Sequence, residues 1–161
     1  MTRNHAWRAS SRAIPVVVAL GMLLVGPVPL PSFTFNAAAD IGGGSGELFG
    51  SSAAGLGDLD SPSDGFHELV IGAPKATTPG GTPVVEAGAV AVFRGSSDIQ
   101  TRSLTMADAD LVIRGASTAG HLGQAIGTTD WNGNGRLDLL VGEPDNGPGR
   151  MYVVPDSLIT A

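Results

Sequence analysis

The sequence predicts an all-β fold that is built from short strands in repeated units. Short runs rich in Val, Leu and Ile alternate with turn residues, which 24 Gly and 11 Pro supply. Runs of this length between turn residues are typical of strands. The strands expected from them are residues 88–93, 110–115, 137–142 and 149–154. Residues 76–86 are expected to form a loop and residues 95–109 a polar connection, with a short helix within 104–109.

An internal repeat is the second observation behind this fold class. Gly65 and Gly135 are 70 residues apart, and so are Pro74 and Pro144. Around both pairs an apolar residue and a Gly come first, then an acidic loop, then an apolar run that ends in Gly-x-Pro. Two landmarks with one offset indicate a repeat rather than chance.

The second copy of the acidic loop, residues 130–138, has the spacing of a metal-binding loop. Side-chain oxygens occupy positions 1, 3, 5 and 9, which are Asp130, Asn132, Asn134 and Asp138. Gly135 stands where the chain must turn sharply, and Arg136 can offer its backbone carbonyl. Calcium takes six to eight oxygen ligands, and alternate residues of a tight loop can direct them to one centre. A plain Asn-Gly turn is the alternative.

This loop differs from an EF-hand, although it starts like one. An EF-hand ends with a bidentate Glu at position 12 and lies between helices. Position 12 is Val141, and the flanking segments are short and rich in β-branched or apolar residues. The sequence therefore predicts a calcium loop between two strands.

The first copy of the loop is richer in carboxylates but differs in length. Its candidate ligands are Asp58, Asp60, Asp64 and Glu68. With Gly65 aligned to Gly135, this loop is two residues longer, and Pro62 lies within the extra length.

These residues resemble the FG-GAP repeat, which builds the β-propeller of integrin α-subunits and occurs in secreted bacterial proteins. Phe49-Gly50, the acidic loop and Gly72-Ala73-Pro74 carry the resemblance, which covers about residues 44–161. In the second copy Leu122 replaces the Phe and Glu143 replaces the Ala.

The resemblance implies β-propeller blades, with repeat 1 at residues 44–104 and a truncated repeat 2 at residues 105–161. It also implies calcium as the bound ion, with side-chain ligands at the positions given above and the Arg136 carbonyl as a further ligand. A propeller needs at least four blades, so two repeats leave three interpretations open. The chain is part of a longer propeller, assembles with copies of itself through open blade edges, or is stable as a calcium-stapled pair.

The first 39 residues are expected to be a secretory signal. Arg3, Arg8 and Arg12 precede an apolar stretch at residues 14–25, and small residues at 37–39 offer a cleavage site. The stretch is too short for a stable membrane span, although an uncleaved anchor is the alternative. The sequence predicts a secreted or cell-surface protein. The chain has no Cys and can form no disulfide, so bound calcium is the cross-link expected to stabilise it.

The net charge of the chain and the motifs around its histidines limit the classes of function that the sequence supports. Without residues 1–39 the chain has 15 acidic and six basic residues, a formal charge of −9 that disfavours nucleic-acid binding. His67 and His121 lie in no known catalytic motif. The sequence therefore predicts a non-catalytic, calcium-binding interaction or adhesion module with a protein or glycan ligand. The alternative is a fragment of a larger secreted propeller-containing enzyme, a hydrolase or phospholipase.

Overall fold

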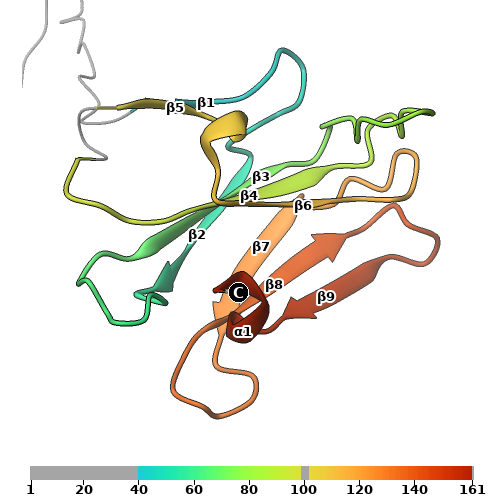
Figure 1. The fold of residues 1–161 in the computed structure, drawn as a ribbon. Helices are drawn as coiled ribbons and strands as arrows, with labels where there is room; N and C mark the ends of the chain where they lie inside the picture. Colours follow the sequence, from blue (N-terminus) through green and yellow to red (C-terminus); the bar gives the residue numbers. More distant parts are fainter. Residues whose placement is uncertain (1–39, 99–101, 161) are drawn as a thin grey trace, which may run out of the picture. The chain divides into compact units, whose positions relative to one another are not determined.

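The computed structural model describes residues 40–98 and 102–160, and the expected signal at residues 1–39 lies outside them. Within the described ranges the chain forms nine strands in three β-sheets, with one 3-10 turn and one four-residue helix (Figure 1). The all-β prediction is confirmed at this level.

The first sheet is a four-stranded antiparallel sheet in the order β2-β3-β4-β6. Its strands are β2 (Ser52–Gly57), β3 (Glu68–Ala73), β4 (Ala89–Phe93) and β6 (Leu111–Arg114). The strands expected at 88–93 and 110–115 are thus confirmed with slightly different ends. Because β6 pairs with β4, this sheet extends past the expected repeat boundary at residue 104.

The second sheet is three-stranded and antiparallel, in the order β7-β8-β9. It consists of β7 (Ala125–Thr129), β8 (Asp138–Glu143) and β9 (Arg150–Val154). These strands correspond to β2, β3 and β4 of the first sheet, and β9 occupies the edge. The described residues provide no counterpart of β6 for this sheet.

Both sheets begin with the same turn. The N–H of Gly50 donates to the carbonyl of Gly72 at 2.9 Å, and the N–H of Gly123 donates to the carbonyl of Gly142 at 2.9 Å. Gly50 has φ 87° and Gly123 has φ 86°, a conformation in which glycine carries no steric penalty. The repeated glycines therefore have a common physical role, which is to join the start of the first strand of each sheet to the Gly-x-Pro turn.

The main core lies between the two sheets. On the first sheet Val70, Val90 and Val92 face it, and Leu139 and Val141 face it from the second. All five are at most 2 % exposed. The inner strands approach so closely that a Cβ on Gly72 would lie 2.2 Å from the carbonyl oxygen of Gly123. Only glycine fits at this contact.

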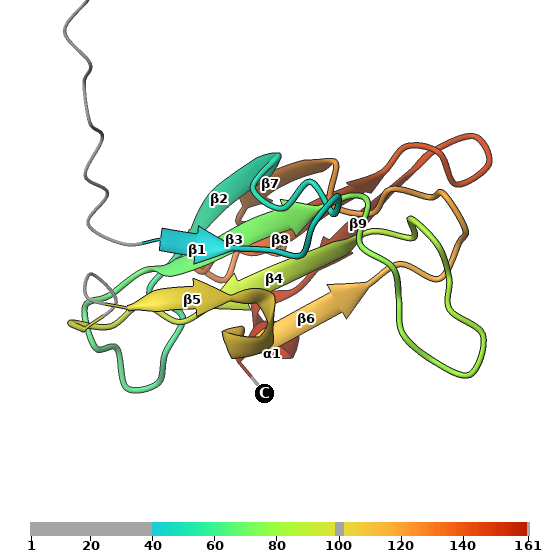
Figure 2. The same cartoon turned by 90° about the horizontal axis from the view of Figure 1, so that it is seen from above.

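A third, small sheet covers the opposite face of the first sheet. It pairs β1 (Asp40–Gly42) in parallel with β5 (Ser103–Thr105), and the 3-10 helix η2 (Met106–Asp108) follows (Figure 2). Leu104 packs there with Ile71 and Phe93 of the first sheet. The helix expected within 104–109 is thus a single 3-10 turn.

Candidate metal sites in two equivalent loops

The two predicted metal loops occupy equivalent connections of the fold. The first joins β2 to β3 across residues 58–67, and the second joins β7 to β8 across residues 130–137. In each sheet this is the connection from the first strand to the second. The fold therefore places both loops at the same end of equivalent strand pairs.

The first acid of each loop accepts a hydrogen bond from the turn glycine. Asp58 Oδ2 accepts from the N–H of Gly65 at 2.7 Å, and Asp130 Oδ2 accepts from the N–H of Gly135 at 2.9 Å. The two glycines have φ 87° and 85°. The extra two residues of the first loop are thus absorbed before this glycine.

The last acid of each loop fixes the residue in position 2. Glu68 Oε2 accepts from the N–H of Leu59 at 2.7 Å, and Asp138 Oδ2 accepts from the N–H of Trp131 at 2.9 Å. Glu68 is 3 % exposed and Asp138 is 1 % exposed. Glu thus replaces Asp in the first loop without a change of hydrogen-bonding role.

A third pair of residues completes the correspondence. Asp64 Oδ1 accepts from the N–H of Phe66 at 2.9 Å, and Asn134 Oδ1 accepts from the N–H of Arg136 at 2.8 Å. Three acceptors of each loop therefore bond to equivalent backbone donors. This agreement supports the alignment of the two loops that the sequence suggested.

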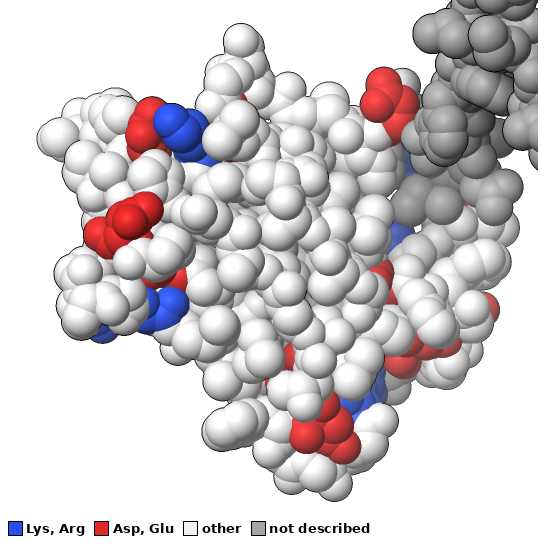
Figure 3. Space-filling view, turned by 180° about the vertical axis from the view of Figure 1, so that it is seen from behind, with Lys and Arg blue, Asp and Glu red and all other residues white. Residues whose placement is uncertain are grey.

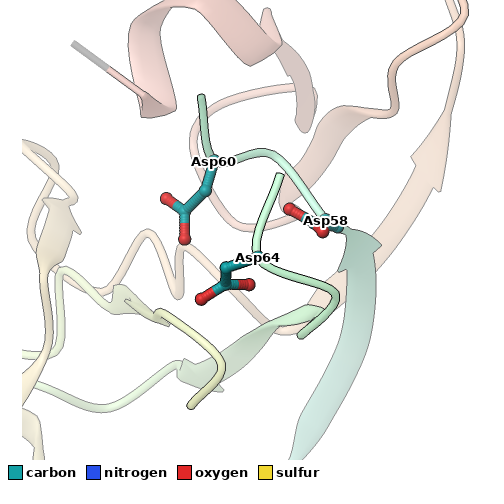
Figure 4. A group of neighbouring side chains, drawn as sticks. All are labelled: Asp58, Asp60 and Asp64. Atoms are coloured by element: carbon teal, nitrogen blue, oxygen red, sulfur yellow. The ribbon is translucent and has the colours of Figure 1, made fainter. Parts of the chain in front are cut away.

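Three carboxylates of the first loop lie together. Oxygen atoms of Asp58, Asp60 and Asp64 are all within 4.8 Å of one another, and Figure 4 shows the three side chains around the inside of the loop. The Nε atom of Arg94 lies 3.6 Å from Asp60 Oδ1. One guanidinium leaves a net negative charge on this group.

Two carboxylate oxygens of the first loop are buried without a hydrogen-bond partner, Asp58 Oδ1 and Glu68 Oε1. The Ser63 hydroxyl and the Gly65 N–H lower the pKa of Asp58, which favours its charged form. Burial raises the pKa of Glu68, and the charges of Asp60 and Asp58 add to this effect. Buried carboxylate oxygens are normally satisfied by a donor or a cation. The unpartnered Asp58 oxygen belongs to the group of Asp58, Asp60 and Asp64, which fits a hard divalent cation. Glu68, the fourth predicted ligand, lies outside this close group, although its Oε1 is also unpartnered.

The second loop also directs its oxygens inward, but through more hydrogen bonds. Asp130 Oδ1 accepts from Gly133 at 2.7 Å and from Asn134 at 3.0 Å, and Asn132 Oδ1 accepts from the same Asn134 N–H at 3.0 Å. Asn132 Nδ2 donates to Asp138 Oδ1 at 3.3 Å. The structure thus brings the predicted positions 1, 3 and 9 together around one turn.

Arg136 has a role beyond the predicted carbonyl ligand. Its Nη2 donates to the carbonyl of Leu59 in the first loop, and its Nε lies 3.2 Å from Asp156 Oδ2. Asp156 is the first residue of helix α1 (Asp156–Ile159), and it is 6 % exposed. Sequence reasoning missed Asp156 because it lies after the last predicted strand. Its position directly after Pro155, at a helix start, was the available signal.

Trp131, at position 2 of the second loop, and His121 lie outside the predicted ligand sets, and His121 is half-buried. Trp131 is 71 % exposed. His121 Nδ1 lies 2.6 Å from Asp145 Oδ2, and its Nε2 lies 3.3 Å from Glu86 Oε2. The hydrogen bond to Asp145 raises the pKa of His121. These contacts form a surface ion-pair cluster at the Gly-x-Pro end of the sheets.

Figure 3 shows no basic patch among the described residues on one face of the molecule. On the face shown in Figure 3, Lys and Arg lie near the rim and mostly beside Asp or Glu. The helices within the described residues are too short or too polar to cross a membrane.

Comparison with known proteins gives a partial similarity, and no family model matches the chain. The chain is 31% identical over 102 residues to the phosphatidylinositol-glycan-specific phospholipase D of Rattus norvegicus, and 32% identical over 96 residues to that of Mus musculus. These segments are 60% and 57% of this chain but 11% of each relative. The chain thus spans about a tenth of the length of these curated relatives. This all-β chain is similar to a short part of a phospholipase D.

Proposed function

We propose that the chain is a secreted calcium-binding module of FG-GAP-like β-propeller blades that acts in protein interaction or adhesion and is itself non-catalytic. The equivalent hydrogen bonds of the two loops carry this proposal, together with the unpartnered buried oxygens of Asp58 and Glu68. The four-stranded sheet has the strand order of one blade, and the three-stranded sheet repeats its first three strands.

Calcium would be held in the first loop by Asp58, Asp60, Asp64 and Glu68. In the second loop the side chains of Asp130, Asn132, Asn134 and Asp138 would hold it with the Arg136 carbonyl. The ion would neutralise the loop acids and fix the connection between the first two strands of each blade. Binding to the folded state alone would stabilise the fold in proportion to the logarithm of calcium concentration over the dissociation constant.

Calorimetric titration of the full chain with calcium tests this role. Two sites with dissociation constants of the extracellular class, on the order of 10⁻⁴–10⁻³ M, are expected. Asp58→Ala and Asp130→Ala should each remove one site. Titration with magnesium is the control, because magnesium prefers a small octahedral shell and should bind more weakly. A chain that binds no calcium would contradict the proposal.

A protein or glycan ligand on the blade loops is the proposed partner, and self-association is the second possibility. The edge strand β9 has exposed apolar side chains, with Met151 62 % and Val153 37 % exposed. Unpaired edge strands favour association with further strands. Analytical ultracentrifugation over a range of concentrations would detect copies that associate.

The alternative function is that of a non-catalytic part of a larger secreted enzyme. The partial similarity to phosphatidylinositol-glycan-specific phospholipase D favours this reading. It predicts a hydrolase domain in frame beside these 161 residues in the coding sequence. Sequencing the flanking region distinguishes the two functions, since an isolated module requires no such domain.

A further inference from the structure

The peptide group of Leu59 connects the two loops. Its N–H donates to Glu68 Oε2 at 2.7 Å within the first loop, and its carbonyl accepts from Arg136 Nη2 of the second loop. Leu59 is 2 % exposed and belongs to the core between the sheets. A shift of this peptide therefore moves a hydrogen-bond partner of Glu68, a candidate ligand of the first loop, and of Arg136 in the second loop.

Asp156 connects the Arg136 side chain to the candidate ligands of the second loop. Its Oδ2 lies 3.2 Å from Arg136 Nε, and its Oδ1 accepts from Asn134 Nδ2 at 2.9 Å. Its N–H donates to Asp138 Oδ1 at 2.9 Å. Asp156 thus contacts two candidate ligands of the second loop, Asn134 and Asp138, and the Arg136 side chain that reaches the first loop.

The contacts form a continuous path between the loops. It runs from Glu68 through Leu59, Arg136 and Asp156 to Asp138. The step from Arg136 to Asp156 is an ion pair. The other three steps are hydrogen bonds with one charged partner, and such bonds are the stronger kind. Both end carboxylates are buried, so solvent screens this path less than it screens a surface ion pair.

We propose that Arg136 is a positioning residue that couples the two loops, so that a cation in one loop raises the affinity of the other. This inference rests on the proposed function of the loops. An ion in the first loop fixes Glu68 and with it the Leu59 peptide, which orients Arg136 and Asp156 for the second loop. The conformational entropy that these residues lose when the first ion binds is then not lost again when the second ion binds.

Terbium luminescence tests the coupling because Trp131 occupies position 2 of the second loop. In the full chain with Trp7→Phe, Trp131 is the remaining Trp, so sensitised emission reports on the second loop. Disabling the first loop with Asp58→Ala should weaken terbium binding at the second by about fivefold or more, the lower end of usual coupling between sites. In an Arg136→Met background, the same Asp58→Ala change should alter the affinity less than twofold.

Reciprocity provides a second measurement. By linkage, Asp130→Ala should weaken calcium binding at the first loop by the same factor, as measured by calorimetry. Arg114→Met is the matched control, because Arg114 ends β6 opposite Ala89, at the far end of the sheet from the loops. It should leave the full coupling in place. Asp156→Asn, which keeps the backbone N–H to Asp138, tests the path again if Arg136→Met does not fold, and it should also reduce the coupling.

Two results would overturn the inference in different ways. If both loops bind with the same constants whether or not the other is intact, or if the coupling survives both Arg136→Met and Asp156→Asn, the loops are independent but the proposed calcium function stands. If neither loop binds calcium or terbium, the proposed function fails and the coupling fails with it.

Discussion

Replacing Asp130 by Ala separates the structural role of this side chain from its role as a metal ligand. Its carboxylate accepts hydrogen bonds from the N–H groups of Gly133, Asn134 and Gly135 at 2.7, 3.0 and 2.9 Å. Asp130 is exposed, so these bonds contribute less than they would in the interior. The arrangement resembles a helix N-cap, for which replacement by Ala costs about 1 kcal/mol.

Calcium adds a second, conditional contribution. With a dissociation constant of about 10⁻⁴–10⁻³ M and about 10 mM calcium, one site stabilises the fold by roughly 1.4–2.7 kcal/mol. Asp130→Ala should therefore lower the free energy of unfolding by about 1 kcal/mol in chelator. In calcium it should lower it by about 2–4 kcal/mol, since the ion's contribution is lost as well.

Urea denaturation of the full chain, followed by circular dichroism in chelator and in calcium, measures both values. Asp108→Ala is the matched control. The carboxylate of Asp108 also accepts two hydrogen bonds in a turn, from the N–H and the hydroxyl of Thr105, each at 2.8 Å. Its effect should be the same in calcium and in chelator. An equal loss for Asp130→Ala in the two conditions would refute the assignment of Asp130 as a ligand.

Three further predictions concern the core and the titrating groups. Leu139 is fully buried between the sheets, so Leu139→Ala should lower the free energy of unfolding, measured by urea denaturation, by about 3–4 kcal/mol. Leu158 is 65 % exposed, so Leu158→Ala should lower it by under about 0.5 kcal/mol. Similar losses for the two variants would place the core elsewhere. The hydrogen bond to Asp145 raises the pKa of His121, so its stabilisation is complete below about pH 6.5 and is lost as the pH rises through the folded-state pKa. Melting temperatures at pH 6 and pH 8.5 should differ less in His121→Asn than in the unchanged chain, and an unaltered pH dependence would exclude this ion pair as a source. Burial raises the pKa of Glu68, so without metal its ionisation at neutral pH opposes folding. Glu68→Gln should therefore raise the melting temperature in chelator at pH 7 but reduce the increase that calcium brings, and a lower melting temperature in chelator would contradict the burial argument.

The sequence predicted the strands that are rich in Val, Leu and Ile. It did not predict β2, whose residues Ser-Ala-Ala-Gly-Leu-Gly have little β-propensity. This strand forms through its antiparallel pairing with β3, which runs from Ser52 opposite Gly72 to Gly57 opposite Glu68. The pairing of β1 with β5 was also missed, since it joins segments about 60 residues apart through three residues each. Local sequence patterns do not encode such contacts.

For the candidate sites, the spacing of acidic residues singled out Asp58, Asp60 and Asp64, whose oxygen atoms lie together in the first loop. What the spacing did not reveal was the connection between the loops. Arg136 was predicted to act through its carbonyl, but its side chain reaches Leu59, 77 residues earlier in the chain. Asp156 is 18 residues beyond its partner Asp138. The first contact depends on how the two sheets pack. The second depends on the pairing of β8 with β9, in which Leu139 lies opposite Val154. No periodicity within either repeat predicts them.

The two sheets differ in how many of their faces are covered, and this difference explains why the loops matter. The first sheet is covered on one face by the second sheet and on the other by Leu104 and its neighbours. In the second sheet, Leu140 pairs with Val153 and Gly142 with Met151 on the face away from the core. Met151 and Val153 are exposed there. This sheet has less apolar burial to hold it. We therefore expect the contacts of Asp138 and Asp156 around the second loop to account for a larger share of its stability than the contact of Glu68 does in the first sheet.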